Sequence, residues 1–160
     1  MTLRAPWMLA VAALAACSPM AADAGERQAA TAPARHPQSG LEVIPLTVTH
    51  AGKAYRFRVE VARSPAEQAK GLMFRTAMAP DEGMLFPRDP PDVASFWMRN
   101  TVIPLDIIYI GTDRRILNIA NAVPYDETPL PSAGVASAVL ELNGGRAAEL
   151  GIVPGDRVSW

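Results

Sequence analysis

The pattern of apolar and polar positions predicts short β-strands over most of the chain after residue 40. Residues 55–61 alternate apolar and charged side chains, which is typical of a strand with one buried face and one solvent-exposed face. Residues 42–49 are rich in Val, Ile and Thr, and a turn at residues 50–53 separates the two segments, which predicts a β-hairpin. Further apolar runs between Pro, Gly and Asp predict strands at residues 84–86, 94–98, 105–110, 116–120 and 135–142.

Two segments carry the start signals or stop signals of short helices. Ser64 and Glu67 fit a capping box with Pro65 at the first helical position, so we expect a helix to begin there. A second helix is expected at residues 146–150, where Gly151 is placed to end it. Neither helix is long enough to dominate the fold, so the strands must define the architecture.

The overall fold class follows from this order of elements. Pro154 and Gly155 suit the two central positions of a type II turn, and a closing strand is expected from Val158. Many short strands with two brief helices predict a mainly β or α+β fold, in the form of a compact barrel-like domain. The apolar fraction of 49% is ample for one packed core, and we expect a single globular domain over residues 41–160.

The N-terminal part of the chain follows a different pattern. Residues 5–16 are almost purely apolar but too few to span a bilayer, which is typical of the apolar region of a secretory signal peptide. Small residues precede Cys17, the only cysteine, and this combination resembles the lipobox of bacterial lipoproteins. The resemblance implies that residues 1–16 are cleaved as a signal peptide and that Cys17 is lipidated. The alternative is an ordinary signal peptide with a chance cysteine.

The expected location is the cell envelope, with the lipid on Cys17 as the membrane contact. Residues 17–40 contain Ala, Pro, Ser, Gln and scattered charge without apolar periodicity, so we expect a flexible tether. Ser18, rather than an acidic residue, follows the cysteine. In Gram-negative lipoproteins this resembles the pattern of proteins sent to the outer membrane, so an exported, periplasm-facing outer-membrane protein is expected.

Charge and residue types exclude several function classes. The net charge is −1 with both signs interspersed, so we expect no nucleic-acid partner. No phosphate-binding or dinucleotide glycine motif is present, and we expect no cofactor. His and Cys are too few for a zinc site or a Ser-His-Asp triad, and the spacing of the methionines favours core packing over a copper site, so we expect no metal. The oligomeric state is not predicted.

The candidate functional residues are polar side chains inside apolar segments. Asp106 and Glu141 lie within apolar strand runs, where a carboxylate either faces solvent or is partly buried with a raised pKa. Trp97 places a large aromatic ring close to the polar Asn100. We predict that Trp97, Asn100, Asp106 and Glu141 form a pocket that binds a small polar ligand or an envelope partner without catalysis.

Two alternatives stay open at this point. Asp106 and Glu141 could be the acid/base pair of a carboxylate enzyme, for instance one that acts on glycans. The chain could instead be a structural interaction module, in which these carboxyl groups only stabilise the fold. The geometry of the two carboxyl groups distinguishes the alternatives, since an enzyme needs them to face each other across a cleft.

Several short motifs occur in order along the domain. They are Gly71-Leu72-Met73-x-Arg75, Gly83-Met84-Leu85-Phe86, Phe96-Trp97-Met98-x-Asn100-Thr101, Pro104-Leu105-Asp106, Leu140-Glu141-Leu142 and Gly155-Asp156. Together they resemble the family known as domain of unknown function 192, a small bacterial and archaeal domain that is often exported. The match extends from about Val59 to Val158. The resemblance implies a compact β-rich fold and no agreed activity, and it leaves the lipobox and tether outside the family domain.

Overall fold

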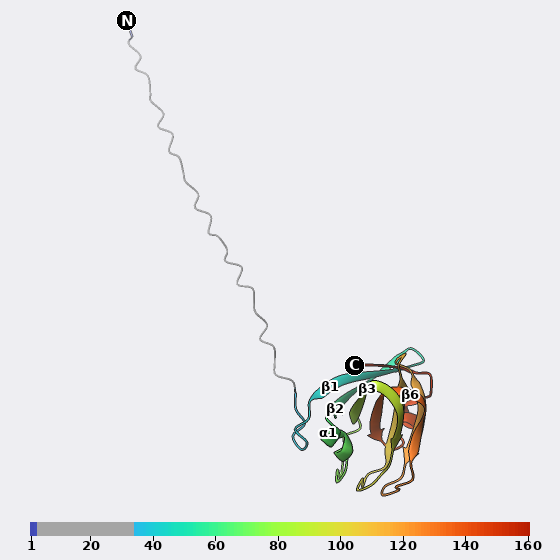
Figure 1. Ribbon diagram of the computed structural model, residues 1–160. Helices are drawn as coiled ribbons and strands as arrows, with labels where there is room; N and C mark the ends of the chain where they lie inside the picture. Colours follow the sequence, from blue (N-terminus) through green and yellow to red (C-terminus); the bar gives the residue numbers. More distant parts are fainter. Residues whose placement is uncertain (3–33) are drawn as a thin grey trace. The chain divides into compact units, whose positions relative to one another are not determined.

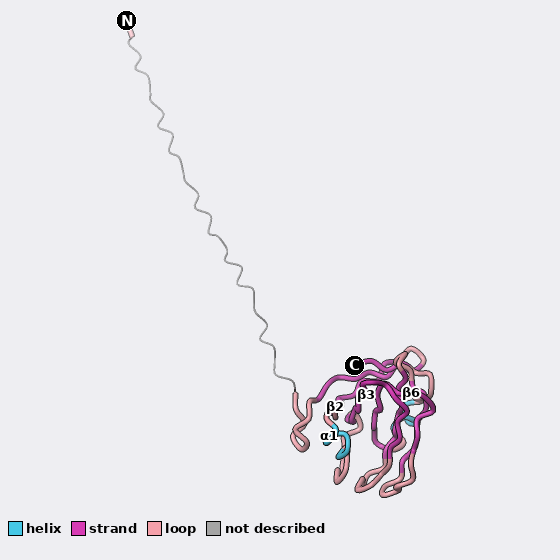
Figure 2. The backbone as a smooth tube through the Cα atoms, viewed as in Figure 1, coloured by secondary structure: helices cyan, strands magenta, loops and turns pink. Residues whose placement is uncertain are grey.

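One curled, seven-stranded β-sheet with two short helices forms the body of the domain (Figures 1 and 2). The strands are β1 (Val43–His50), β2 (Lys53–Val61), β3 (Glu82–Phe96), β4 (Leu105–Gly111), β5 (Ile116–Ala122), β6 (Leu130–Asn143) and β7 (Arg157–Ser159). The helices are α1 (Pro65–Lys70) and α2 (Arg146–Leu150). The sheet order is β5-β4-β6-β3-β2-β1-β7, and β2 and β3 form a parallel pair connected through α1. The predicted mainly β, barrel-like fold with two short helices is confirmed.

The computed structural model describes residues 1–2 and 34–160. The apolar run at residues 5–16 and Cys17 therefore lie outside the described residues, and the predicted signal peptide and lipidation stay predictions. Within the described part of the chain, no helix is both long enough and apolar enough to cross a membrane.

The two edge strands of the sheet come together at one end, which gives the sheet its barrel-like curl. Ile116 at the start of β5 donates its N–H to the carbonyl of Asp156 at 2.9 Å. Val158 on β7 donates to the carbonyl of Arg114 at 2.8 Å. These hydrogen bonds satisfy backbone groups that an open sheet would leave unpaired at its edges.

The local start and stop signals are confirmed. Ser64 caps α1, and the side chain and backbone of Ser64 and Glu67 form the reciprocal bonds of a capping box. Gly151 ends α2 with a left-handed φ of 74°. The turn before β7 also forms: Asp156 donates its N–H to the carbonyl of Val153, and Gly155 has a φ of +94°, as a type II turn requires.

Side chains pack on both faces of the sheet, in two clusters. The first core takes residues from all seven strands and from α2, among them Phe57, Ile108, Leu142 and Ala147. The second core lies on the opposite face of β3, β4 and β6 and consists of Ala62, Leu72, Met84, Phe86, Ala94, Met98, Leu105, Ile107, Tyr109, Ala122, Ala136 and Val139. Strand alternation decides which core each residue of a central strand enters.

The folded domain begins before the boundary that the sequence predicted. Residues 34–40, which were assigned to the tether, form a turn: the N–H of Gly40 donates to the carbonyl of His36, and Arg35 bridges to Glu42. The hydroxyl of Ser39 donates to the buried carboxylate of Glu60 on β2. The composition of this segment predicted a flexible tether. Its order comes from a contact with β2, and such a tertiary contact cannot be inferred from composition.

β3 is longer than either of the two runs that predicted it. The runs at residues 84–86 and 94–98 belong largely to one strand, Glu82–Phe96, which pairs with β6 on both sides of a register shift between Pro87 and Asp92. The prolines separate the two runs in the sequence, but a bulged strand can accommodate them. Trp97 follows directly after the end of β3.

Candidate ligand-binding site

Glu141 is buried on the second-core face of the sheet. It lies on β6 opposite Met84 of β3 and Ile107 of β4, and it is 5% exposed. β3 approaches β6 closely because Gly83 on β3 has no side chain: a Cβ atom there would lie 2.5 Å from the carbonyl oxygen of Glu141. A carboxyl group that water barely reaches is therefore held at a rigid position in the centre of the sheet.

The carboxyl group of Glu141 lacks the partners that a buried carboxylate normally has. Its Oε2 atom is buried and has no hydrogen-bond partner. Burial raises the pKa of Glu141 to about 8, because desolvation disfavours the charged form. At neutral pH the neutral carboxylic acid predominates, and it can both donate and accept a hydrogen bond.

Glu141 lines a pocket of about 250 Å³. Residues 68–73, from the end of α1 and the loop after it, line one side of the pocket. Phe86, Arg88, Phe96 and Trp97 line it from β3 and its C-terminal end. This pocket joins a buried acid to an aromatic wall, which is the combination typical of small-molecule sites.

The aromatic wall is well ordered by its own packing. The rings of Phe86 and Phe96 meet edge to face with centroids 5.1 Å apart, and Phe96 meets Tyr109 in the same way at 6.2 Å. The hydroxyl of Tyr109 donates to the carbonyl of Leu130, and burial, followed by the charge of Glu141, raises the pKa of Tyr109. Tyr109 is therefore a structural group that packs against Phe96, since its hydroxyl already forms a hydrogen bond.

Arg88 brings a cation to the same pocket. Strand alternation places Arg88 on the face of β3 that also carries Met84 and Phe86. Its Nε atom is buried and has no hydrogen-bond partner. Two buried polar atoms, one on Glu141 and one on Arg88, are thus unsatisfied in the lining of one pocket.

Asp106 lies on the opposite face of the sheet and does not line this pocket. It is fully buried opposite Leu142, on the side of the first core. Its Oδ1 accepts hydrogen bonds from the side-chain amide of Asn121 at 2.8 Å and from the N–H of Gly145 at 2.9 Å. Its Oδ2 accepts from the N–H of Ala147 at 2.7 Å. Asp106 therefore anchors the start of α2 to β4 and β5.

The structure does not bring Asp106 and Glu141 together. Asp106 pairs with Leu142, and Glu141 pairs with Ile107. Each carboxyl group therefore lies one residue away from the position directly opposite the other. Side chains one position apart point to opposite faces of a sheet. The pair of carboxyl groups that the enzyme alternative requires is therefore not formed by these two residues.

Of the remaining predicted site residues, one lines the pocket and one does not. Trp97 is 49% exposed at the pocket wall, and the Arg99 guanidinium lies 5.0 Å from the centre of its ring. Asn100 is exposed in a left-handed conformation, with its Nδ2 3.9 Å from the sulfur of Met73 and its carbonyl accepting the N–H of Phe74. Asn100 supports the loop beside the pocket rather than the pocket itself.

Neither Arg88 nor a buried ion pair between Arg75 and Glu60 was indicated by the sequence pattern. Arg75 donates two hydrogen bonds to Glu60, at 2.9 and 3.1 Å, and both side chains are buried. The alternation in residues 55–61 predicted that Glu60 faces solvent, whereas the turn at residues 34–40 covers it. No local pattern reveals this burial, although Arg75 belongs to one of the family motifs.

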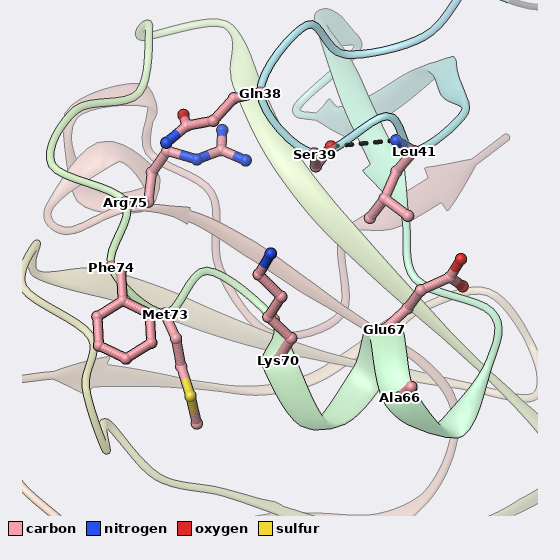
Figure 3. Close-up of a pocket in the computed structure, with 10 residues that line it drawn as sticks. Gln38, Ser39, Leu41, Ala66, Glu67, Lys70, Met73, Phe74 and Arg75 are labelled. Carbon is pink, nitrogen blue, oxygen red and sulfur yellow. Dashed lines mark hydrogen bonds between the residues drawn. The ribbon is translucent and has the colours of Figure 1, made fainter.

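A second pocket of about 410 Å³ lies beside this cluster and shares residues 70, 71 and 73 with the first pocket (Figure 3). Figure 3 shows the side chain of Lys70 rising from α1 into this space, with Phe74 and Met73 on one side and Leu41 on the other. Here every described hydrogen bond of the Arg75 guanidinium goes to the Glu60 carboxylate or to His36. Among the described residues that line the second pocket, none has a buried side-chain nitrogen or oxygen atom without a hydrogen-bond partner.

The curled sheet and the pocket define a small β-rich domain that has, on one face, a pocket lined by the buried carboxyl group of Glu141. Residues 46–160 match the DUF192 family, described as an uncharacterized ACR, and the chain belongs to this family. The family resemblance seen in the sequence motifs is thus confirmed for the domain.

Two solved structures resemble this chain closely. A protein of unknown function from Novosphingobium aromaticivorans is 67% identical, with a TM-score of 0.79, and the match covers 82% of this chain and 94% of that one. A protein from Sinorhizobium meliloti, described as a candidate transcription regulator, is 39% identical, with a TM-score of 0.72, and the match covers 74% of this chain and 94% of that one. No curated protein matches the chain.

Within residues 1–2 and 34–160, no group of three or more His, Cys, Asp and Glu side chains is placed to hold a metal. The lining of the first pocket provides one carboxyl group, the guanidinium group of Arg88, the ammonium group of Lys70 and aromatic rings.

Proposed function

We propose that this protein is a lipid-anchored binding protein of the cell envelope, whose DUF192 domain holds a small ligand in the pocket of Glu141 and Trp97. The observation that carries the proposal is the buried Oε2 atom of Glu141, which has no partner. A buried polar group without a hydrogen bond costs about 1–3 kcal/mol. A ligand that supplies the missing partner recovers this free energy on binding, and it gains apolar contacts at the Trp97 wall.

The surroundings of Glu141 favour binding over catalysis. Asp106 faces the other core, so it cannot act as a second acid or base beside Glu141. The hydroxyl of Tyr109 is bonded to Leu130 and stays protonated, because burial raises its pKa. A single neutral acid in an aromatic pocket suits recognition of a polar group, whereas general acid/base chemistry commonly needs a positioned pair.

The anchor in this proposal rests on the N-terminal sequence. An apolar segment of signal-peptide length precedes Cys17, which is the only cysteine of the chain. Lipid on Cys17 would hold the domain at the envelope membrane, and two or more acyl chains would make this attachment stable. The net charge of −1 does not favour a nucleic-acid partner.

The test is a fragment screen that uses the indole N–H resonance of Trp97 as the reporter. Ligands that enter the pocket are expected to shift the Trp97 resonance and to leave that of Trp160, whose ring packs against Arg114, unchanged. Glu141→Leu is expected to abolish the shifts produced by polar fragments, and Glu149→Gln, at an exposed carboxylate on α2, serves as the matched control. A screen in which no fragment selectively perturbs Trp97 would contradict the proposal.

A further inference from the structure

We infer that the pocket is built for a small carboxylate, held by Glu141 and Arg88, with a flat apolar body packed against the ring of Trp97. This inference rests on the proposed function and specifies the ligand class of the same site. It follows from three properties of the pocket: two unsatisfied polar atoms, the charge of the lining, and the shape and volume of the apolar part.

The two unsatisfied atoms lie in the lining of one pocket but do not satisfy each other. Oε2 of Glu141 and Nε of Arg88 are both buried without a partner, and the two side chains form neither a hydrogen bond nor an ion pair with each other. They come from neighbouring strands, β6 and β3, on the same face of the sheet. A ligand group that reaches both atoms would satisfy two buried polar groups at once.

The charge of the lining favours an anion. The ionisable side chains near Glu141 are Arg88 from β3 and Lys70 from α1, which line the same pocket, and Tyr109 from β4, whose pKa is raised by burial and by the charge of Glu141; none of them forms a hydrogen bond or ion pair with Glu141. Without a paired cation, the buried carboxyl group is mainly neutral at pH 7. The pocket lining then has two cationic side chains, Arg88 and Lys70, and no anionic side chain.

Hydrogen-bond directions lead to the same ligand class. The neutral acid of Glu141 presents an O–H donor, and Arg88 presents an N–H donor. A carboxylate offers an acceptor oxygen to each, and hydrogen bonds to a charged acceptor are shorter and stronger than neutral ones. An ammonium ligand would instead have to ionise Glu141 and approach two cationic side chains.

The apolar part of the pocket limits the size of the ligand. Its volume of about 250 Å³ is below the range of roughly 300–1,000 Å³ that is common for drug-sized ligands. Phe86 and Phe96 form a fixed edge-to-face pair, and the half-exposed ring of Trp97 completes the wall. A single planar ring with a short carboxylate arm matches this space.

The experiment compares phenylacetate, phenylacetamide and phenethylamine, which share one ring and differ in the polar group. Binding to the full chain is followed through the Trp97 indole resonance at about pH 6.5, well below the pKa of Glu141. Phenylacetate is expected to bind about tenfold or more tightly than the amide or the amine, because only it forms charge-assisted bonds with both donors. Arg88→Gln is expected to remove most of this preference, and Arg58→Gln, at an exposed arginine on β2, is expected to retain it.

A second arm uses pH to separate the role of Glu141 from that of the apolar wall. Between about pH 6.5 and about pH 9.5, phenylacetate affinity is expected to fall about tenfold or more, because Glu141 loses its donor and becomes an anion. Glu141→Gln keeps an N–H donor at both pH values, so it is expected to bind phenylacetate without this fall.

Each contrary result has a distinct meaning. Preferential binding of phenethylamine, or equal binding of all three compounds, would overturn the carboxylate assignment and leave the binding pocket in place. Failure of phenylacetate to perturb Trp97 at millimolar concentration would also overturn the assignment, and the fragment screen then decides whether the proposed function fails with it.

Discussion

The carboxylate of Asp106 and the backbone N–H of Ala147 are joined by a 2.7 Å hydrogen bond, which fixes the first turn of α2 to β4. The same carboxylate accepts the N–H of Gly145, the residue before α2. A short helix has unpaired N–H groups in its first turn, and here a fully buried side chain from a neighbouring strand satisfies two N–H groups at the start of α2. Asp106 thus stabilises the fold of the domain and holds α2 in place.

Asp106→Asn is expected to destabilise the domain by about 2 kcal/mol or more. The substitution removes charge-assisted hydrogen bonds, and its amide NH₂ would face a backbone N–H. Urea unfolding measures the loss, with Asp81→Asn at an exposed site as the control. A variant that is as stable as the wild-type protein but unable to bind any ligand would contradict the structural role of Asp106. It would indicate that Asp106 belongs to the binding site.

Stability is expected to fall as the pH rises from about 4.5 to about 8, through the titration of Glu141. In the unfolded chain a Glu titrates near pH 4.3, whereas in the folded protein burial raises the pKa of Glu141 to about 8. Between these values the folded state binds one more proton than the unfolded state, so its stability is fully present below the lower pKa and decreases toward the upper one. The decrease attributable to Glu141 is up to about 5 kcal/mol.

Glu141→Gln provides the comparison for this pH dependence. Unfolding free energies of the wild-type protein and the variant are measured across the same pH range, so other titrating groups cancel in the difference. The variant is expected to be more stable than the wild-type protein at about pH 9. A constant difference between the two proteins at all pH values would show that Glu141 titrates normally.

Gly155→Val is expected to destabilise the domain by about 1 kcal/mol or more. Gly155 has a φ of +94°, a conformation that a β-branched residue adopts only with strain, although a side chain there would point into open space. The strain would act on the turn between α2 and β7, which forms backbone hydrogen bonds with Ile116 at the start of β5. Thermal unfolding checks the prediction, with Val153→Ala as a control in the same turn, and an unchanged melting temperature in Gly155→Val would contradict it.

Cys17→Ala is expected to prevent lipid attachment and the associated processing, since the chain contains no other thiol. Labelling cells with a clickable fatty acid checks this, and Ser18→Ala, which retains the cysteine, serves as the control. Continued labelling of the Cys17 variant would refute the lipoprotein proposal. Fractionation of the labelled wild-type protein tests the expected outer-membrane location.

Local signals in the sequence were sufficient to predict most of the secondary structure. The capping box at Ser64 and Glu67 and the type II turn at Gly155 depend on a few neighbouring residues, so the sequence alone predicts them. Apolar runs likewise predicted the positions of the central strands. The joining of two runs into the long β3 could not be predicted, because the bulge that accommodates its prolines depends on pairing with β6.

The site shows the limit of sequence information more directly. The sequence by itself determined that Asp106 and Glu141 are carboxyl groups within buried strands, and both side chains are indeed buried. Only the tertiary structure decided that they face opposite cores, because the register between β4 and β6 determines which residues share a face. The burial of Glu60 and the placement of Arg88 beside Glu141 also depend on contacts between segments distant in the sequence, and strand alternation within one segment carries no information about its neighbours.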